Sequence, residues 1–241
     1  MTAGPNRPER PDPHVRPLRY SDGLSLQLGA SAVLVVLGWW VADPTGSWLG
    51  LSGATWLAAA FAVPVVHQLY VWAAWRSELL HRTWTRRFGD RALRVFGLGF
   101  FVLFALRPVT MVGLAVADRG TLWTPGPVSW VAAALLAAPA VWTLASVVLF
   151  FGARRALGVD HFVPGFDEPF VRRGAFAHVP NAMYTLAFLL LWAIAVAAGS
   201  RAALVAAAVQ HALIWVHYVA TERPDMQVIY GGRPLSSSPP R

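Results

Sequence analysis

The sequence predicts an all-α, polytopic integral membrane protein: a helical bundle with about six transmembrane helices. Apolar residues make up 56% and charged residues 13% of the 241 residues, and the mean hydropathy is +0.48. A soluble domain carries roughly 25% charged residues, so this chain has too little polar surface to cover a water-soluble core. Its apolar residues also fall in runs long enough to cross the roughly 30 Å hydrocarbon core of a bilayer as helices.

Six apolar runs are candidate spans, at residues 24–42, 48–75, 95–117, 128–151, 183–199 and 202–220. The second begins near residue 54, and Arg107 and Pro108 interrupt the third. Only Ser200 and Arg201 separate the last two runs, so we expect a tight helical hairpin there. One transmembrane domain, residues 24–230, contains all six.

The two ends of the chain are polar and carry no apolar run. Residues 1–23 are rich in Pro and Arg, which predicts a disordered cytoplasmic tail rather than a signal peptide. Residues 231–241 include a Ser-Ser-Ser-Pro-Pro-Arg end and predict a second disordered tail.

Arginine placement predicts the orientation of the bundle. All 20 basic residues are Arg, and 17 of them fall on one side of the six spans, with two on the other side and Arg107 inside a span. Because cytoplasmic loops carry the excess of basic residues, both termini and the two long loops are expected in the cytoplasm. We interpret the loop arginines of residues 76–94 as topology determinants and anionic-lipid contacts.

Several classes of function are excluded or disfavoured by composition. The chain has no Cys, which excludes disulfides, thiolate nucleophiles and Cys-ligated metals. Asp160, His161 and His178 match no compact metal motif, so we expect no metal. The basic residues lie between apolar runs, which favours membrane topology over nucleic-acid binding.

Two polar stretches meet on the predicted cytoplasmic face. Residues 152–182 lead into Tyr184 and the fifth span, and residues 217–230 follow the sixth span. Because a tight hairpin brings its two open ends together, we expect Tyr184 and Glu222 to be neighbours. The sequence therefore predicts one composite site within residues 152–230.

These two stretches carry a resemblance to a known family. Residues 174–184 (Gly-Ala-Phe-Ala-His-Val-Pro-Asn-Ala-Met-Tyr) and residues 222–230 (Glu-Arg-Pro-Asp-Met-Gln-Val-Ile-Tyr) resemble the motifs of the membrane-embedded methyltransferases. This group includes phosphatidylethanolamine N-methyltransferase and isoprenylcysteine carboxyl methyltransferase. Pro180, Ala182 and Arg223 stand where the family pattern has Arg, Pro and Glu.

The resemblance implies S-adenosylmethionine as cofactor and methyl donor. It implies catalytic roles for Glu222, Tyr184 and His178, and the implied cofactor-binding residues are Gly97, Gly99, Gly174, Phe176, His178, Asn181, Met183, Tyr184 and Glu222. Glu222 suits the ammonium of the cofactor, while Tyr184 and Phe176 suit its adenine or sulfonium. His178, His217 and Glu222 are alternative proton acceptors.

Two features have a structural interpretation beside the functional one. Gly97 and Gly99 contact the cofactor in one interpretation, but small residues in membrane helices more often serve close packing. Arg107 is either a functional intramembrane charge or a residue lining a break of its own helix at Pro108.

The resemblance implies an integral-membrane, S-adenosylmethionine-dependent methyltransferase. The acceptor would be a membrane lipid or a hydrophobic small molecule, most simply an amine head group as in phospholipid methylation. We expect a multi-pass location in a bacterial inner membrane. The alternatives are a carboxyl methyltransferase of a prenylated acceptor and a non-enzymatic membrane protein, either a transporter subunit or a binding or sensory module.

Overall fold

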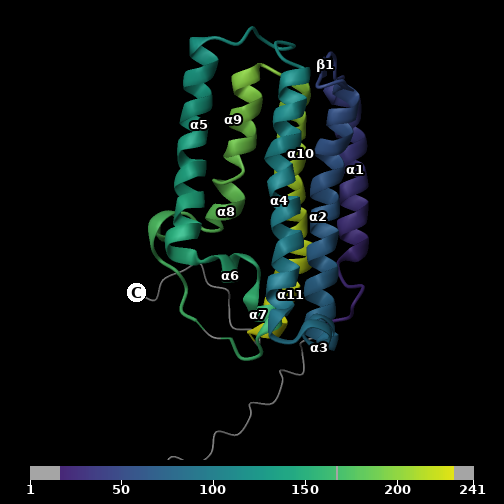
Figure 1. The fold of residues 1–241 in the computed structure, drawn as a ribbon, viewed down its shortest axis with the longest axis vertical. Helices are drawn as coiled ribbons and strands as arrows, with labels where there is room; N and C mark the ends of the chain where they lie inside the picture. The colour runs from purple at the N-terminus through teal and green to yellow at the C-terminus, as the bar shows by residue number, and fades with distance from the viewer. Residues whose placement is uncertain (1–16, 167, 231–241) are drawn as a thin grey trace, which may run out of the picture.

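The computed structural model describes residues 17–166 and 168–230, which form an elongated bundle of helices (Figure 1). Within these residues, five helical stretches are long and apolar enough to cross a membrane: Leu24–Ala42, Gly53–His81, Thr83–Ala117, Pro127–Phe151 and Arg201–Ile229. A shorter apolar stretch, Ala182–Ala198, makes a sixth. The predicted all-α membrane bundle is confirmed.

The first half of the bundle consists of three long helices. These are α1 (Leu24–Ala42), α2 (Gly53–His81) and α4 (Ala92–Ala117). A small antiparallel hairpin of β1 (Ser47–Trp48) and β2 (Leu51–Ser52) joins α1 to α2. The helix α3 (Thr83–Phe88) and a 3-10 turn, Gly89–Arg91, join α2 to α4. The hairpin marks the upper end of the bundle and α3 marks the lower end, as both are drawn in Figure 1.

The second half contains α5 (Pro127–Ser146), which continues as a π-helical turn, Val147–Phe151. The short helices α6 (Ala153–Ala156) and α7 (Val159–Phe162) follow at the lower end, then a 3-10 turn, Gly174–Ala177. The chain returns upward through α8 (Ala182–Thr185) and α9 (Leu189–Ala198). It descends through α10 (Arg201–His217), the π-helical segment η4 (Tyr218–Glu222) and α11 (Arg223–Ile229).

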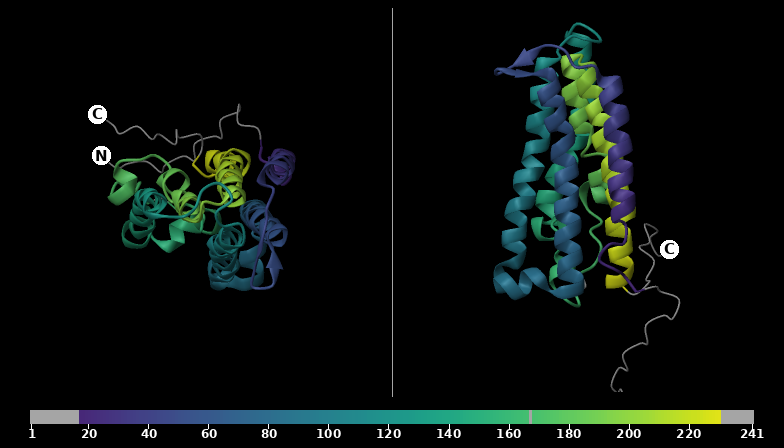
Figure 2. Two further views of the ribbon diagram at one scale, coloured as in Figure 1. Left: turned by 90° about the horizontal axis from the view of Figure 1, so that it is seen from above. Right: turned by 90° about the vertical axis from the view of Figure 1, so that its right-hand side faces the viewer.

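Small residues let the long helices pack closely. Helix α1 lies along α10, α2 along α4 and α5 along α9 (Figures 1 and 2). The face of α10 toward the core carries fully buried alanines, Ala202, Ala203, Ala206 and Ala207. A Cβ on Gly38 of α1 would lie 2.7 Å from the Val209 side chain of α10. Close approach of this kind is how helices associate without a hydrophobic driving force in lipid.

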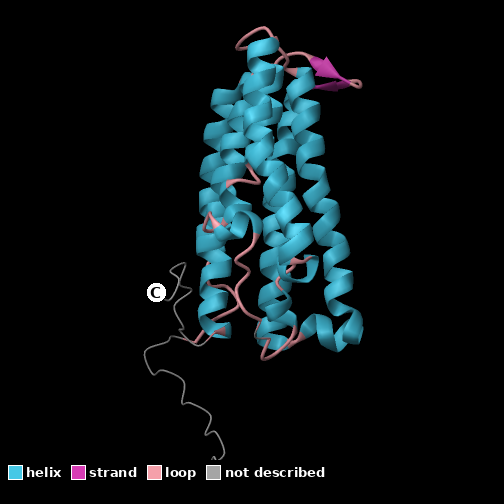
Figure 3. Cartoon of the chain, turned by 90° about the vertical axis from the view of Figure 1, so that its left-hand side faces the viewer, coloured by secondary structure: helices cyan, strands magenta, loops and turns pink. Residues whose placement is uncertain are grey.

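The outer surface of the bundle is apolar. Trp40 of α1 is 82% exposed, and Val128 and Leu135 of α5 are 85% and 71% exposed. Contiguous exposed apolar side chains on this scale are unusual for a soluble monomer, and they suit contact with lipid tails. Figure 3 shows the bundle from another side, with the strand hairpin projecting beyond the helices at one end.

Three details differ from the sequence-based expectations. Helix α4 is continuous through Arg107 and Pro108, so the alternative in which the third span is broken and Arg107 lines the break is wrong. The hydroxyl of Thr110 donates to the carbonyl oxygens of Leu106 and Arg107 at 2.9 and 3.0 Å, which helps the helix to tolerate the proline. The fifth span is instead the interrupted one, because turns at residues 186–188 separate α8 from α9.

The third difference concerns the N-terminal segment. Residues 17–23, which the sequence analysis assigned to a tail, are described and rest against α2. The ring of Tyr20 meets the ring of Trp72 edge-on with centroids 5.1 Å apart. Residues 1–16 and 231–241, which make up the rest of the two predicted tails, lie outside the described residues.

Candidate active site at the lower half of the bundle

The predicted α9–α10 hairpin is present at the upper end. Gly199 ends α9 with φ +61°, a conformation that favours glycine, and a Cβ there would lie 2.1 Å from the carbonyl oxygen of Trp123. Ser200 caps α10, its Oγ accepting the N–H of Ala203 at 3.0 Å. Helix α10 then contacts α8 on its way down, which brings the two open ends of the hairpin together.

Tyr184 and Glu222 are in direct contact there. The hydroxyl of Tyr184, in α8, donates a hydrogen bond to Oε2 of Glu222, the last residue of η4. The rings of Trp215 and Tyr218 lie edge-on to that of Tyr184, with centroids 5.9 and 6.0 Å away. The predicted proximity of Tyr184 and Glu222 is confirmed. Aromatic rings beside a carboxylate form a setting that attracts a cation.

The preceding loop residues dock on α5 and its π-helical turn. Gly174 has φ +58°, and a Cβ there would lie 2.4 Å from Oγ of Ser146. The ring of Phe176 stacks on that of Phe151 with centroids 4.8 Å apart. These contacts fix the loop that leads to Tyr184, and a direct cofactor contact by Gly174 or Phe176 stays a prediction.

The remaining residues of this motif lie on either side of Tyr184. His178 is exposed, and its ring lies 5.9 Å from that of Trp142. Asn181 has φ +50° and starts α8, its carbonyl oxygen accepting the N–H of Tyr184 at 2.8 Å. Met183 is partly buried. The catalytic role of His178 and the cofactor contacts of all three residues stay predictions.

Gly97 and Gly99 of α4 have packing roles. A Cβ on Gly97 would lie 2.9 Å from Cδ1 of Leu157, and one on Gly99 would lie 2.6 Å from the hydroxyl oxygen of Tyr70. Both contacts support the packing interpretation of these residues. Cofactor binding by Gly97 and Gly99 stays a prediction.

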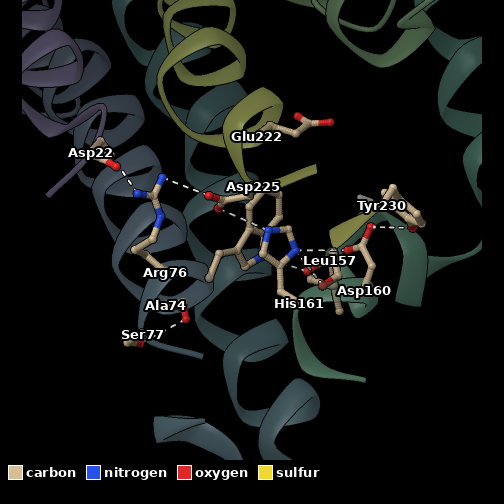
Figure 4. Close-up of polar contacts among 12 residues, drawn as sticks. Asp22, Ala74, Arg76, Ser77, Leu157, Asp160, His161, Glu222, Asp225 and Tyr230 are labelled. Carbon is tan, nitrogen blue, oxygen red and sulfur yellow. Dashed lines mark hydrogen bonds and ion pairs between the residues drawn. The ribbon is translucent and has the colours of Figure 1, made fainter. Parts of the chain in front are cut away.

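A buried charge network lies below Glu222, and the sequence analysis did not find it (Figure 4). Nη2 of Arg76 pairs with Oδ1 of Asp225 at 2.9 Å. Nε2 of His161 lies 3.3 Å from Oδ2 of Asp225, and its Nδ1 lies 3.1 Å from Oδ1 of Asp160. The hydroxyl of Tyr230 donates to Oδ2 of Asp160 at 3.2 Å. The network thus joins α2, α7 and α11.

The geometry of this network favours a charged imidazole. Each ring nitrogen of His161 faces a carboxylate, and both can be hydrogen-bonded only if both carry a proton. Burial lowers the pKa of His161, but its hydrogen bonds to Asp160 and Asp225 outweigh burial and raise the pKa to about 9. Burial likewise raises the pKa of Asp160, but the hydrogen bond to His161 and the imidazolium charge outweigh it, so this pKa is lowered.

The N-terminal segment is attached to the same network. Nη1 of Arg76 donates to the carbonyl oxygens of Arg19 and Asp22 at 2.7 and 3.1 Å. The Arg76 side chain is fully buried, so its interpretation as a lipid contact is wrong, whereas its role as a topology determinant stays a prediction. The sequence held a signal for this, because Arg76 follows the apolar run Val71–Trp75 without a turn residue between them.

The described residues contain no group of three or more His, Cys, Asp or Glu side chains suited to a metal ion. Some buried polar groups of the lower half are paired in the network above, whereas others, such as the hydroxyl of Thr221, have no hydrogen-bond partner among the described residues.

Comparison with protein families identifies the second half of the bundle. Residues 128–233 match the family model described as phospholipid methyltransferase. No curated protein and no solved structure matched the chain. The matched segment contains Tyr184 and Glu222, whereas Arg76 and Arg107 precede it. The predicted resemblance to the membrane-embedded methyltransferases is therefore confirmed for the part of the chain from α5 to α11, which is less than half of its length.

Proposed function

We propose that this chain is an integral-membrane methyltransferase that uses S-adenosylmethionine to methylate a membrane-partitioned acceptor, with the amine head group of a phospholipid as the first candidate. The observation that carries the proposal is the contact between Tyr184 and Glu222. Thirty-eight residues separate them in the sequence, and they belong to the two stretches that resemble the methyltransferase motifs. The family match over residues 128–233 supports the same activity.

The side chains of this region fit a cationic cofactor. Tyr184, Trp215 and Tyr218 form a mutually edge-on group of rings beside the Glu222 carboxylate. Aromatic faces attract a sulfonium or ammonium group, and a carboxylate hydrogen-bonds an ammonium. The hydroxyl of Thr221, next to Glu222, is fully buried without a hydrogen-bond partner among the described residues. It is therefore available to a ligand.

When bound, S-adenosylmethionine supplies an activated methyl group, which moves to the acceptor nitrogen as the S–C bond breaks and the N–C bond forms. The chain must align the two reactants and exclude water, and alignment alone can supply a large part of the rate enhancement. In the proposal the aromatic group orients the cationic centre. Glu222 accepts the proton that the nitrogen loses, because its carboxylate lies beside the aromatic group that orients the cationic centre.

The experiment is transfer of a labelled methyl group from S-adenosylmethionine by purified protein in liposomes that contain phosphatidylethanolamine. Wild type should form labelled lipid, and the rate of its formation should fall by about 100-fold or more in Glu222→Gln, because removal of a general base typically lowers the rate by this factor. The matched control is Glu168→Gln, since Glu168 is an exposed carboxylate paired with Arg155 at the lower end, and it should retain wild-type activity.

Mass spectrometry of lipids from cells with and without the protein identifies the acceptor independently. The proposal expects a series of amine lipids, each heavier than the last by one CH2 unit, only where the protein is present. An unchanged lipid profile together with no labelled product from wild type would overturn it.

A further inference from the structure

Arg107 is a buried cation in the middle of the bundle. Its side chain points inward from α4, and the residue is only 6% exposed. Its guanidinium makes no hydrogen bond or ion pair within residues 17–166 and 168–230, and its Nε is fully buried. The carbonyl oxygens of Leu106 and Arg107 near Pro108 accept from Thr110 instead. The structure thus gives Arg107 no role in lining a break of its own helix.

Two buried histidines share this region with Arg107. His67 of α2 is 5% exposed and His217 of α10 is 4% exposed. The charge of Arg107 acts on both rings, which places the three side chains within electrostatic range of one another. Both ring nitrogens of His67 and Nδ1 of His217 are buried without a hydrogen-bond partner among the described residues. Each of three helices therefore buries a side chain with an unsatisfied nitrogen, and the three side chains interact electrostatically.

This cluster, Arg107 with His67 and His217, adjoins the Tyr184–Glu222 contact. Arg107 and Tyr184 also interact electrostatically. The guanidinium also lies over the ring of Phe188, 5.7 Å from its centroid, one turn beyond Tyr184. A cation and a carboxylate thus both interact with the same tyrosine.

We propose that Arg107, His67 and His217 form an oxyanion subsite that holds the anionic end of a zwitterionic ligand whose cationic end lies at Tyr184 and Glu222. The inference rests on the proposed function and gives it a substrate chemistry. The oxyanion is either the phosphodiester of an amine phospholipid or the carboxylate of the methyl donor. Arg107 precedes the segment that matches the family model, so the subsite would be supplied by the other half of the bundle.

The physical reason is the cost of an unpaired charge. An Arg at the centre of a membrane helix costs roughly 2.5–3.5 kcal/mol on insertion scales, and such residues normally face a partner or a pathway. Guanidinium binds phosphate and carboxylate with two parallel hydrogen bonds, and a neutral imidazole can donate a third. An oxyanion therefore accepts from the guanidinium and from one N–H of each imidazole at the same time.

The test uses Arg107→Gln and Arg107→Lys, with Arg201→Gln as the matched control. Arg201 lies at the other end of the bundle and pairs with the exposed Asp43. In one arm, native mass spectrometry measures binding of phosphatidylethanolamine and of diacylglycerol, which lacks the phosphate. In the other arm, calorimetry measures binding of S-adenosylhomocysteine and of its decarboxylated analogue.

The inference expects Arg107→Gln to weaken binding of one charged ligand by about tenfold or more, as loss of a charge-assisted hydrogen bond does. The affinity for diacylglycerol or for the decarboxylated analogue should be the same in Arg107→Gln as in wild type. Arg107→Lys should retain part of the affinity for the charged ligand, and Arg201→Gln should bind it as tightly as wild type does. The ligand that responds identifies the source of the oxyanion. Wild-type affinity of Arg107→Gln for both charged ligands would overturn the inference.

A second variant separates ligand binding from structural support. Without a native partner, replacing the buried cation by an apolar residue is neutral or stabilising, so Arg107→Met should melt at or above the wild-type temperature when no ligand is added. A large loss of stability would show a structural role and overturn the inference. Lipid binding that depends on Arg107, without any methyl transfer, would contradict the proposed function but not this inference. Methyl transfer by a protein whose ligand binding does not depend on Arg107 would contradict this inference but not the proposed function.

Discussion

Arg76 and Arg107 show that the same residue type has two roles inside this bundle. Arg76 is fully buried but pairs with Asp225 and donates to two backbone carbonyls. Arg107 is nearly as buried, and the structure gives its guanidinium no such partner among the described residues. A buried cation that is paired supports the fold, whereas an unpaired one is a candidate for ligand binding.

The Arg76–Asp225 pair predicts a large loss of stability when one partner is removed. Asp225→Asn leaves the Arg76 guanidinium buried and uncompensated, which costs about 3–5 kcal/mol. Equilibrium unfolding in mixed micelles measures this. Asp43→Asn is the matched control, because Asp43 is 72% exposed in its pair with Arg201, and exposed pairs contribute about 1 kcal/mol or less. Equal effects of the two substitutions would contradict the network.

His161 predicts that stability falls at alkaline pH. Its pKa is raised from 6.5 to about 9 in the folded protein, so its stabilising contribution is complete below pH 6.5 and is lost as pH rises through about 9. The difference corresponds to at most about 3 kcal/mol. The melting temperature of wild type in detergent should fall between pH 7 and pH 9.5, and His161→Gln should flatten that change. An identical dependence of melting temperature on pH in the two proteins would refute this role of His161.

At the scale of elements, one carboxylate ties the connections at the upper end together. Oδ2 of Asp118 accepts from the Ser200 hydroxyl at 2.7 Å and from the Ala202 N–H at 3.0 Å. Oδ1 accepts from the N–H of Thr45 at 3.0 Å. Asp118 is 1% exposed, and it links the α4–α5 connection to the α1–β1 connection and to the α9–α10 hairpin.

Asp118→Ala should therefore destabilise the hairpin without altering the candidate site directly. It leaves the buried N–H of Ala202 and other donors unpaired, which costs about 2–4 kcal/mol. The midpoint of unfolding should fall, while the affinity of the folded variant for S-adenosylhomocysteine should equal that of wild type, since the substitution lies at the opposite end of the bundle. Wild-type stability would contradict the role given to Asp118.

The hairpin was predictable from sequence because its signals are local. Only Ser200 and Arg201 lie between the two apolar runs, so the connection is too short for anything but a tight turn. The proximity of Tyr184 to Glu222 then follows from geometry. The docking of Phe176 on Phe151 was not predictable, since it depends on how far α5 continues as a π-helical turn. Tertiary contacts of this kind leave no periodic pattern in the sequence.

The charge network was not predicted from the sequence, for a related reason. Arg76 was assigned to a loop because it was grouped with the arginines that follow it in residues 82–94, yet α2 continues to His81. The helix carries Arg76 inward beside Trp75, whose ring stacks on that of His161 with centroids 4.2 Å apart. The contacts of Arg76 are with Arg19, Asp22 and Asp225, all more than 50 positions away in sequence, so its place in the chain assigned it to the wrong class.

For the whole molecule, the arginine distribution predicts which end of the bundle faces the cytoplasm. The strand hairpin and α3 lie at opposite ends (Figure 1), and the chain has no native cysteine. Ser47→Cys, in β1, should react with a membrane-impermeant maleimide on intact cells, and Thr83→Cys, in α3, should react only after permeabilisation. The unmodified chain is the control for background. The reverse pattern would contradict the predicted orientation.

The central claim is that Tyr184 and Glu222 act as one unit in methyl transfer, and a double-mutant cycle tests it most directly. The rate of labelled methyl transfer is measured for wild type, Tyr184→Phe, Glu222→Gln and the double variant in the same liposomes. Groups that act together are strongly non-additive, so the double variant should be no slower than Glu222→Gln alone. Wild-type rates in both single variants, or losses that multiply in the double variant, would contradict the claim.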